Sequence, residues 1–527
     1  MPLPYAWLLL ASPAQYSIVP LNNCTRPGNF FCYQGSEKSI GRIQMLDPIA
    51  CAPPTHGQRL AENCSSSNFT SFKGFDPIFR SVGLWGRAGD ETNDAMPPAL
   101  DEVMPPVYAR ALQRMVHDRP AAAEWSDSSS PGLDDEAPMQ RVVFKQSTVL
   151  AHGARCLDGS PSGYYYRAGR GNGSDSWVFY LEGGGLCVEP VDCLARAKTD
   201  LGSSKHWEAT RTDSRNVLST AAFNPFADWN HVFIPYCSGD MHVGRARHKN
   251  LLGLYFAGHR TVATVVSRLL NTTTLGASKR VLLSGGSAGG FGTFHNADWL
   301  ADALGVSRRG TQYAAAPQAG AFFVNRDVAL MAEYTTLNIT TSIVPLASKY
   351  IYDFHGGLAR QPDERPLLDE SCVAAHTVHP TLCWSALGSY EHISSRLFVA
   401  QNLVDQSQAG DVLGADWWPL PLGREKHAAA EAAFKSYFAD ATRAGIVEKV
   451  RQSAASKAVG ADGLFAPSCY AHTGNLCMKA DAVTKVRNVS FAAALHAWMT
   501  AEGRVPHQLV DRCPQGQTDP CNPVCSC

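Results

Sequence analysis

A serine set between two glycines, in the pattern Gly285-x-Ser287-x-Gly289, is the residue combination in this chain that most directly indicates chemistry. The apolar run at 281–283 predicts a strand before it, and apolar residues spaced near the helical period predict a helix after it. A strand, this turn and a helix are typical of a nucleophile elbow, which lifts the Ser287 hydroxyl above a sheet edge and points the N–H of Ala288 at a developing oxyanion. Glycine-rich turns around serine are common, so the hypothesis depends on finding partner residues.

A serine nucleophile of this kind requires an acid and then a histidine later in the chain. Asp405 follows the apolar run 396–400, in the position where a strand-end loop would hold the acid. His472 lies in the segment 468–474, which a disulfide from Cys469 to Cys477 or to a more distant cysteine would fix. Either residue alone is more often an ordinary loop side chain. Their appearance in this order favours a triad of Ser287, Asp405 and His472.

An oxyanion site also needs a backbone donor from a turn after an earlier strand. The glycine run 183–185 follows the apolar segment 177–181 and allows the close backbone approach that such a site requires. The alternative is an ordinary tight loop. The run therefore predicts an oxyanion turn only in combination with the other three residues.

Short apolar runs and helical patterns alternate through the second part of the chain. Strands are predicted at 177–181, 231–235, 281–284 and 396–400, and helices at 257–270, after Ser287 and at 426–450. This alternation predicts an α/β protein with a mostly parallel sheet flanked by helices, in the order of an α/β-hydrolase. We place that catalytic domain at 141–510, followed by a cysteine-rich tail at 511–527.

The first part of the chain differs in composition. Residues 1–20 contain a short apolar run without a preceding positive charge, which we interpret as an atypical signal peptide. Residues 21–140 form an extension that ends in a linker rich in Pro, Ser and Asp. Four cysteines, at 24, 32, 51 and 64, either close a small module there or pair with the main domain.

Composition and cysteine usage restrict the class of protein. A net charge of −1 without a basic run argues against nucleic acid as a partner, and no apolar stretch approaches the ~20 residues needed to span a bilayer. The 16 cysteines lack paired zinc-ligand spacing, so we expect disulfides and no metal. Together with Asn-x-Ser/Thr sequons they predict a secreted glycoprotein. The sequons begin at Asn23, Asn63, Asn68, Asn172, Asn271, Asn338 and Asn488.

Five ordered segments, together covering about residues 150–500, resemble the pectin acetylesterase/Notum family. They are 154–166, the Leu-Glu-Gly-Gly-Gly turn at 181–185, 236–240, 285–290 and 468–472. The resemblance implies an α/β-hydrolase fold and the triad named above. It also implies an oxyanion hole built from the backbone of Gly184, Gly185 and Ala288, with no cofactor.

The chain departs from the family pattern at positions near the acyl pocket. Leu186 stands where plant-type members usually carry tryptophan, and Gly185 stands where the Notum branch usually carries an aromatic residue. Asp405-Gln-Ser-Gln replaces Asp-Ser-Trp-Gln, and Gln318 replaces an acid. These departures concern the acyl chain and the substrate side, whereas the triad positions are intact.

We expect a secreted, monomeric serine carboxylesterase that removes acetyl esters from a polysaccharide such as pectin of the cell wall. The Tyr-Ala-His472 context favours the plant-type branch. A Notum-like deacylase of a lipidated protein is the first alternative, and a catalytically silent glycan-binding protein of the same fold is the second. A serine peptidase ranks below both.

Other residues offer weaker hypotheses. Asp240 and His242 suggest a rival triad, but both precede Ser287 and break the expected chain order. His295 on the predicted helix is more often a packed histidine than a catalyst. Trp417 and Trp418 suggest a sugar-stacking platform, although paired tryptophans are more often core residues.

Overall fold

The structure is a computed structural model that divides into two compact units between Leu133 and Asp134. In the first unit it describes four short strands: β1 (Val19–Pro20) parallel to β2 (Cys32–Tyr33), and β3 (Ile43–Leu46) antiparallel to β4 (Phe69–Phe72). In the second unit the described ranges are 137–187, 190–213, 216–250, 252–322, 362–377, 380–408, 438–453, 461–479, 483–500 and 507–527, with six isolated residues between them. The predicted linker falls almost wholly outside these residues.

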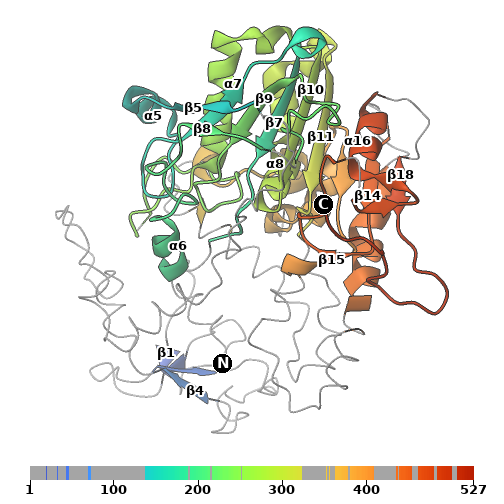
Figure 1. The fold of residues 1–527 in the computed structure, drawn as a ribbon. Helices are drawn as coiled ribbons and strands as arrows, with labels where there is room; N and C mark the ends of the chain where they lie inside the picture. The colour runs from blue at the N-terminus through green and yellow to red at the C-terminus, as the bar shows by residue number, and fades with distance from the viewer. Residues whose placement is uncertain are drawn as a thin grey trace. The chain divides into compact units, whose positions relative to one another are not determined.

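A ten-stranded sheet forms the centre of the second unit, in the order β18-β14-β12-β11-β10-β7-β9-β6-β5-β8 (Figure 1). Its strands are β5 (Met139–Val143), β6 (Gly163–Arg167), β7 (Ser176–Leu181), β8 (Thr210–Arg211), β9 (Asn230–Ile234), β10 (Arg280–Gly286), β11 (Gln312–Gln318), β12 (Phe398–Ala400), β14 (Gly463–Ala466) and β18 (Gln508–Val510). All pairings from β18 to β9 are parallel, and only those involving β5 or β6 are antiparallel. The expected mostly parallel sheet is confirmed.

Helices cover both faces of this sheet because strand residues alternate between two cores. Trp177 and Phe179 of β7 pack in one core, with the apolar faces of α7 (Gly258–Thr272) and α8 (Ala288–Leu304). Val178 packs in the other core, with α16 (Phe491–Thr500). The strands are thus buried on both sides, which explains their nearly continuous apolar sequences.

The remaining elements are short. The helices are α5 (Gln146–His152), α6 (Pro190–Arg196), α9 (Val306–Arg309), α11 (Glu370–Ala375), α12 (Ala386–Ser389) and α15 (Glu448–Ser453). The short helical turns are η4 (Gly171–Gly173), η5 (Thr274–Ala277), η7 (Pro362–Glu364), η8 (Pro380–Trp384) and η9 (Tyr390–His392), and η10 (Arg443–Val447) is a π-helical segment. Two small sheets pair β13 (Val404–Asp405) with β15 (Tyr470–Ala471) and β16 (Lys485–Val486) with β17 (Val489–Ser490). The helix expected at 426–450 is continuous over 438–453, and most of its first half lies outside the described residues.

Six disulfides link all cysteines from Cys156 onward. The pairs are Cys156–Cys237, Cys187–Cys193, Cys372–Cys383, Cys469–Cys525, Cys477–Cys527 and Cys513–Cys521. The four upstream cysteines have no described side chains. The tail is therefore tied to the segment around residue 470, because two of its cysteines pair with Cys469 and Cys477.

Candidate active site

The turn at Ser287 connects β10 directly to α8. Ser287 has φ 58° and ψ −122°, a conformation that a residue with a side chain rarely adopts. Its N–H donates to the carbonyl of Gln318 at 2.9 Å, and its own carbonyl accepts from Phe291 at 2.9 Å. A side chain at Gly289 would overlap the carbonyl oxygen of Leu181. The flanking glycine therefore allows the elbow to sit against the end of β7.

Asp405 and His472 lie together at the same end of the sheet. The Nδ1 atom of His472 is 2.8 Å from Oδ2 of Asp405 and 3.0 Å from its Oδ1. The pairing of β13 with β15 places Asp405 beside Ala471, the residue before His472. Asp405 is fully buried, whereas 21% of the His472 side chain is exposed. This is the geometry in which a carboxylate orients an imidazole.

Two glutamines hold the Asp405 carboxylate. Gln401 donates from Nε2 to Oδ2 at 3.0 Å, and its Oε1 accepts the N–H of Ala321 at 3.2 Å. The N–H of Gln408 donates to Oδ1 at 3.0 Å. Sequence reasoning did not single out Gln401 as a functional residue. Its position directly after β12, four residues before Asp405, could have indicated that it holds the carboxylate.

The His472 loop lies against the elbow. A Cβ placed on Gly286 would be 3.2 Å from Cγ2 of Thr473, so the residues adjoining Ser287 and His472 are in contact range. Among the described residues, Nε2 of His472 is buried and has no hydrogen-bond partner, and Ser287 Oγ forms no hydrogen bond. The structure therefore pairs Asp405 with His472 and places the His472 loop beside the elbow, but it does not join His472 to Ser287 by a hydrogen bond.

The glycine run lies on the other side of Ser287. A Cβ on Gly183 would be 3.0 Å from Cβ of Ser287. Gly184 has φ 147° and Gly185 has φ 75°. Within the described part of the chain, the N–H groups of Gly184, Gly185 and Ala288 donate to no protein acceptor. Unsatisfied backbone donors beside a serine are the requirement for an oxyanion site.

Asp240 and His242 lie behind the glycine run, in a buried network that does not include Ser287. His242 Nε2 is 2.8 Å from the carbonyl oxygen of Glu182, and burial lowers the pKa of His242 to about 4. Asp240 accepts from Ser238 and from the N–H groups of Gly258 and His242, while burial raises its pKa to about 6. These residues support the loop around the glycine run, and the rival triad gains no support from their contacts.

Apolar side chains surround the start of α8. Phe291 packs 5.3 Å from the ring of Trp384, and Phe322 lies 6.4 Å from Phe291 and 6.2 Å from His472. His295 packs 4.5 Å from Phe291 with Nε2 3.1 Å from the carbonyl of Trp384, and burial lowers its pKa to about 4. His295 is therefore a packed, neutral histidine in this structure, in agreement with its sequence interpretation.

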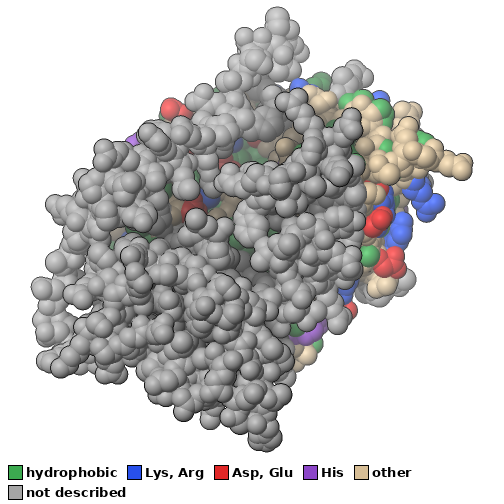
Figure 2. All heavy atoms as spheres, turned by 90° about the horizontal axis from the view of Figure 1, so that it is seen from below, with side chains coloured by type: hydrophobic (Ala, Val, Ile, Leu, Met, Phe, Trp, Pro, Cys, Tyr) green, Lys and Arg blue, Asp and Glu red, His purple; other side chains and the backbone are tan. Residues whose placement is uncertain are grey.

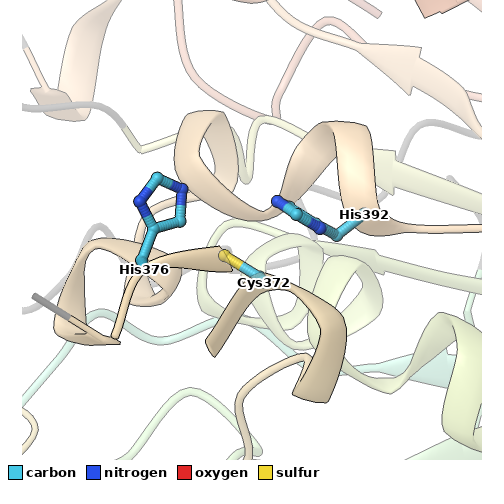
Figure 3. Close-up of side chains that lie close together, drawn as sticks. All are labelled: Cys372, His376 and His392. Carbon is cyan, nitrogen blue, oxygen red and sulfur yellow. The ribbon is translucent and has the colours of Figure 1, made fainter. Parts of the chain in front are cut away.

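Two groups of potential metal ligands lie elsewhere among the described residues. In one, Cys513 and Cys521 lie beside Asp519 but are bonded to each other as a disulfide. In the other, Cys372, His376 and His392 come together (Figure 3). Cys372 is bonded to Cys383, so its sulfur is not a thiolate ligand. His392 Nδ1 is 3.0 Å from Ser371 Oγ. The group does not fit a metal centre in this state.

Figure 2 shows charged side chains on one face of the molecule. In the face shown in Figure 2, basic and acidic side chains of the coloured residues lie close to one another rather than in separate areas. The predicted tryptophan platform at Trp417 and Trp418 lies outside the described residues. Among the residues that are described, no helix has the length and apolar character to cross a membrane.

Comparison with known proteins identifies the family. The family model described as Pectinacetylesterase matches residues 135–526. The chain belongs to this family. Pectin acetylesterase 5 of Arabidopsis thaliana is 29% identical over 424 residues, which are 76% of this chain and 89% of that protein. Palmitoleoyl-protein carboxylesterase notum1 of Xenopus laevis is 29% identical over 425 residues, 75% and 76% of the respective chains.

A solved structure gives the same result for the fold. The Wnt deacylase Notum from Drosophila is similar with a TM-score of 0.57 and 25% identity, covering 74% of this chain and 100% of that chain. The expected α/β-hydrolase-like fold is confirmed. The protein is a carboxylic ester hydrolase, as the acetylesterase and carboxylesterase relatives indicate.

Proposed function

We propose that this member of the pectin acetylesterase family is a secreted serine esterase that removes acetyl groups from a polysaccharide such as pectin. The observation that carries the proposal is the paired Asp405 and His472, with a free imidazole nitrogen, in the loop that contacts the Ser287 elbow. Ser287 attacks the ester carbonyl, and His472 accepts the hydroxyl proton on Nε2. Asp405 keeps the proton of the ring on Nδ1 and stabilises the imidazolium.

The remainder of the reaction follows from the same groups. Charge on the carbonyl oxygen is stabilised by the N–H groups of Gly184, Gly185 and Ala288. The bond between the carbonyl carbon and the sugar oxygen then breaks, His472 gives its proton to that oxygen so that the sugar leaves as a hydroxyl, and the acyl group stays on Ser287. Water, deprotonated by His472, then releases the acid and regenerates the serine. The mechanism requires no metal or organic cofactor.

A short acyl group is favoured by the side chains around the glycine run. The Leu201 and Tyr236 side chains approach Gly184 so closely that a Cβ there would be 2.6 Å and 2.9 Å from them. One of the two relatives reported above, pectin acetylesterase 5, is also an acetylesterase by name. Secretion is supported by six disulfides, since these bonds persist in oxidising compartments.

A longer acyl chain is the second candidate, because partly buried apolar side chains lie around Phe291. Leu186, Leu201 and Phe322 contact this cluster without being fully buried. Such surfaces would accept a fatty acyl group of the kind that the name palmitoleoyl-protein carboxylesterase indicates for the Notum relative.

Acetate release from acetylated pectin, measured beside hydrolysis of p-nitrophenyl acetate and octanoate, tests both candidates. The wild-type protein should release acetate and prefer the short ester, and Ser287→Ala should do neither. A matching long pocket would instead favour octanoate, since each buried methylene contributes about 0.8 kcal/mol. A folded wild-type protein without any esterase activity would contradict the proposal and favour a silent glycan-binding protein.

A further inference from the structure

The peptide between Gly184 and Gly185 is flanked by two glycines with positive φ, 147° and 75°. Glycine populates many backbone conformations, so the local sequence does not determine the orientation of this peptide. The proposed reaction nevertheless requires the N–H of Gly185 to point at the reacting oxygen. A contact outside the turn must therefore supply the orientation.

Arg196 makes such a contact. Its Nη1 donates to the carbonyl oxygen of Gly184 at 2.6 Å. A trans peptide is planar, and its carbonyl and N–H point in opposite directions. Holding the Gly184 oxygen against the guanidinium therefore directs the N–H of Gly185 away from it. That N–H has no acceptor among the described residues, so it is available to a substrate.

The backbone that carries Arg196 is fixed to the same turn. Arg196 is the last residue of α6, and the Cys187–Cys193 disulfide joins α6 to the end of the glycine run. The N–H and the hydroxyl of Thr199 both donate to the Arg196 carbonyl, each at 2.9 Å. The guanidinium is thus presented from a restrained segment.

The contact also changes the electronic character of the peptide. A cation at the carbonyl oxygen polarises the peptide and strengthens hydrogen bonding by its N–H. Arg196 is therefore suited both to orient the Gly185 donor and to strengthen it. Neither effect requires Arg196 to touch the substrate.

We propose that Arg196 is a positioning residue for ester hydrolysis, which fixes the Gly184–Gly185 peptide so that the Gly185 N–H stabilises the oxyanion. This inference rests on the proposed serine mechanism. It predicts a defect in the transition state rather than in substrate binding. An arginine with a merely structural role would instead change stability or KM.

The test compares Arg196→Gln and Arg196→Lys with Lys198→Gln, which removes an exposed cation two residues away. We expect Arg196→Gln to lower kcat for p-nitrophenyl acetate by about 10- to 100-fold, below the full loss of an oxyanion donor. KM should change less than threefold, on the order expected when uniform binding is retained. Arg196→Lys should be intermediate, and Lys198→Gln should match the wild type.

A trifluoromethyl ketone provides the second measurement, because its adduct with serine places an oxyanion in the same position. Its inhibition constant should rise in Arg196→Gln by the same factor as kcat/KM falls, with an unchanged thermal midpoint. A kcat within twofold of wild type, or a rise in KM alone, overturns the proposal. If Arg196→Gln does not fold, the same comparison with Arg196→Lys decides it. Activity surviving in Ser287→Ala would instead overturn the serine mechanism itself.

Discussion

The Nδ1 atom of His472 lies 2.8 Å from Oδ2 of Asp405, a carboxylate without solvent exposure. The two residues are 67 positions apart in the sequence and are brought together by β13 and β15. Asp405 also accepts hydrogen bonds from Gln401 and Gln408, so every partner around it is a donor. These contacts hold the carboxylate in place against Nδ1 of His472, so that Nε2 faces away from Asp405.

Replacement of Asp405 by asparagine should therefore disable the imidazole. The asparagine amide presents an N–H₂ where the surrounding groups also donate, and it favours the wrong tautomer of His472. We expect kcat/KM to fall by about 10³- to 10⁴-fold on a p-nitrophenyl ester. Asp302→Asn, an exposed change on α8, should leave the rate unaltered. Near-normal turnover by Asp405→Asn would remove this residue from the mechanism.

Backbone strain at Ser287 leads to a stability prediction. A residue with a Cβ at φ 58° and ψ −122° is strained, and glycine relieves that strain. Ser287→Gly should exceed Ser287→Ala in unfolding free energy by about 1 kcal/mol in urea titrations, with both variants inactive.

Ser371 on α11 provides the matched comparison, because glycine is unfavourable within a helix. There the alanine variant should be the more stable of the two. If the alanine variant were also the more stable of the two at Ser287, the elbow would carry no strain.

The Cys469–Cys525 disulfide restrains the His472 loop. Because the Cys477–Cys527 disulfide already joins the same two segments, the Cys469–Cys525 bond closes an additional loop of only about 10 residues, for which chain entropy gives a stabilisation of about 3 kcal/mol. Cys469→Ala/Cys525→Ala should lower the thermal midpoint and also reduce kcat, because His472 loses its fixed position. An unchanged kcat at a temperature where the variant is folded would separate the disulfide from catalysis.

Five buried histidines should make the fold sensitive to acid. Burial lowers the pKa of His242, His259, His295 and His355 to about 4, and burial together with the nearby Arg167 charge lowers that of His231 to about 3. The unfolded chain then binds more protons below pH 6.5, so the free energy of unfolding falls as pH drops toward 4. Two buried carboxyls act in the opposite direction: burial raises the pKa of Asp240 to about 6 and also raises the pKa of Glu182.

Urea titrations at pH 7, 6 and 5 measure this effect. We expect a loss on the order of 1–2 kcal/mol per histidine between pH 7 and pH 5, reduced by the gains from Asp240 and Glu182. His259→Gln, on α7 and away from Ser287, should make the dependence shallower by about one proton. Stability that stays constant or rises on acidification would contradict this assignment.

Much of the fold follows from local sequence patterns. The runs at 177–181, 231–235 and 281–284 are apolar because their strands are buried on both faces, and each forms a strand within one or two residues of its predicted bounds. The Gly-x-Ser-x-Gly turn could be predicted as well, because its strand, turn and helix are consecutive in the sequence and a short stretch of residues shows all three.

Long-range partners were less accessible to sequence reasoning. The pairing of Cys469 with Cys525, rather than with Cys477, depends on how the tail crosses the His472 loop. The contact of Arg196 with the Gly184 carbonyl depends on the position of α6. Its acceptor is a backbone oxygen, which every residue has, so no residue type in the sequence indicates the contact. The burial of Asp240 and His242 behind the glycine run likewise appears only in three dimensions.

Covalent labelling of Ser287 tests the central claim most directly. A fluorophosphonate ester should modify the folded wild-type protein once, and peptide mass spectrometry should place the adduct on Ser287. The adduct should be absent from Ser287→Ala and slow to form in His472→Ala, in parallel with the loss of ester hydrolysis. Modification of a different residue, or full esterase activity in Ser287→Ala, would contradict the account.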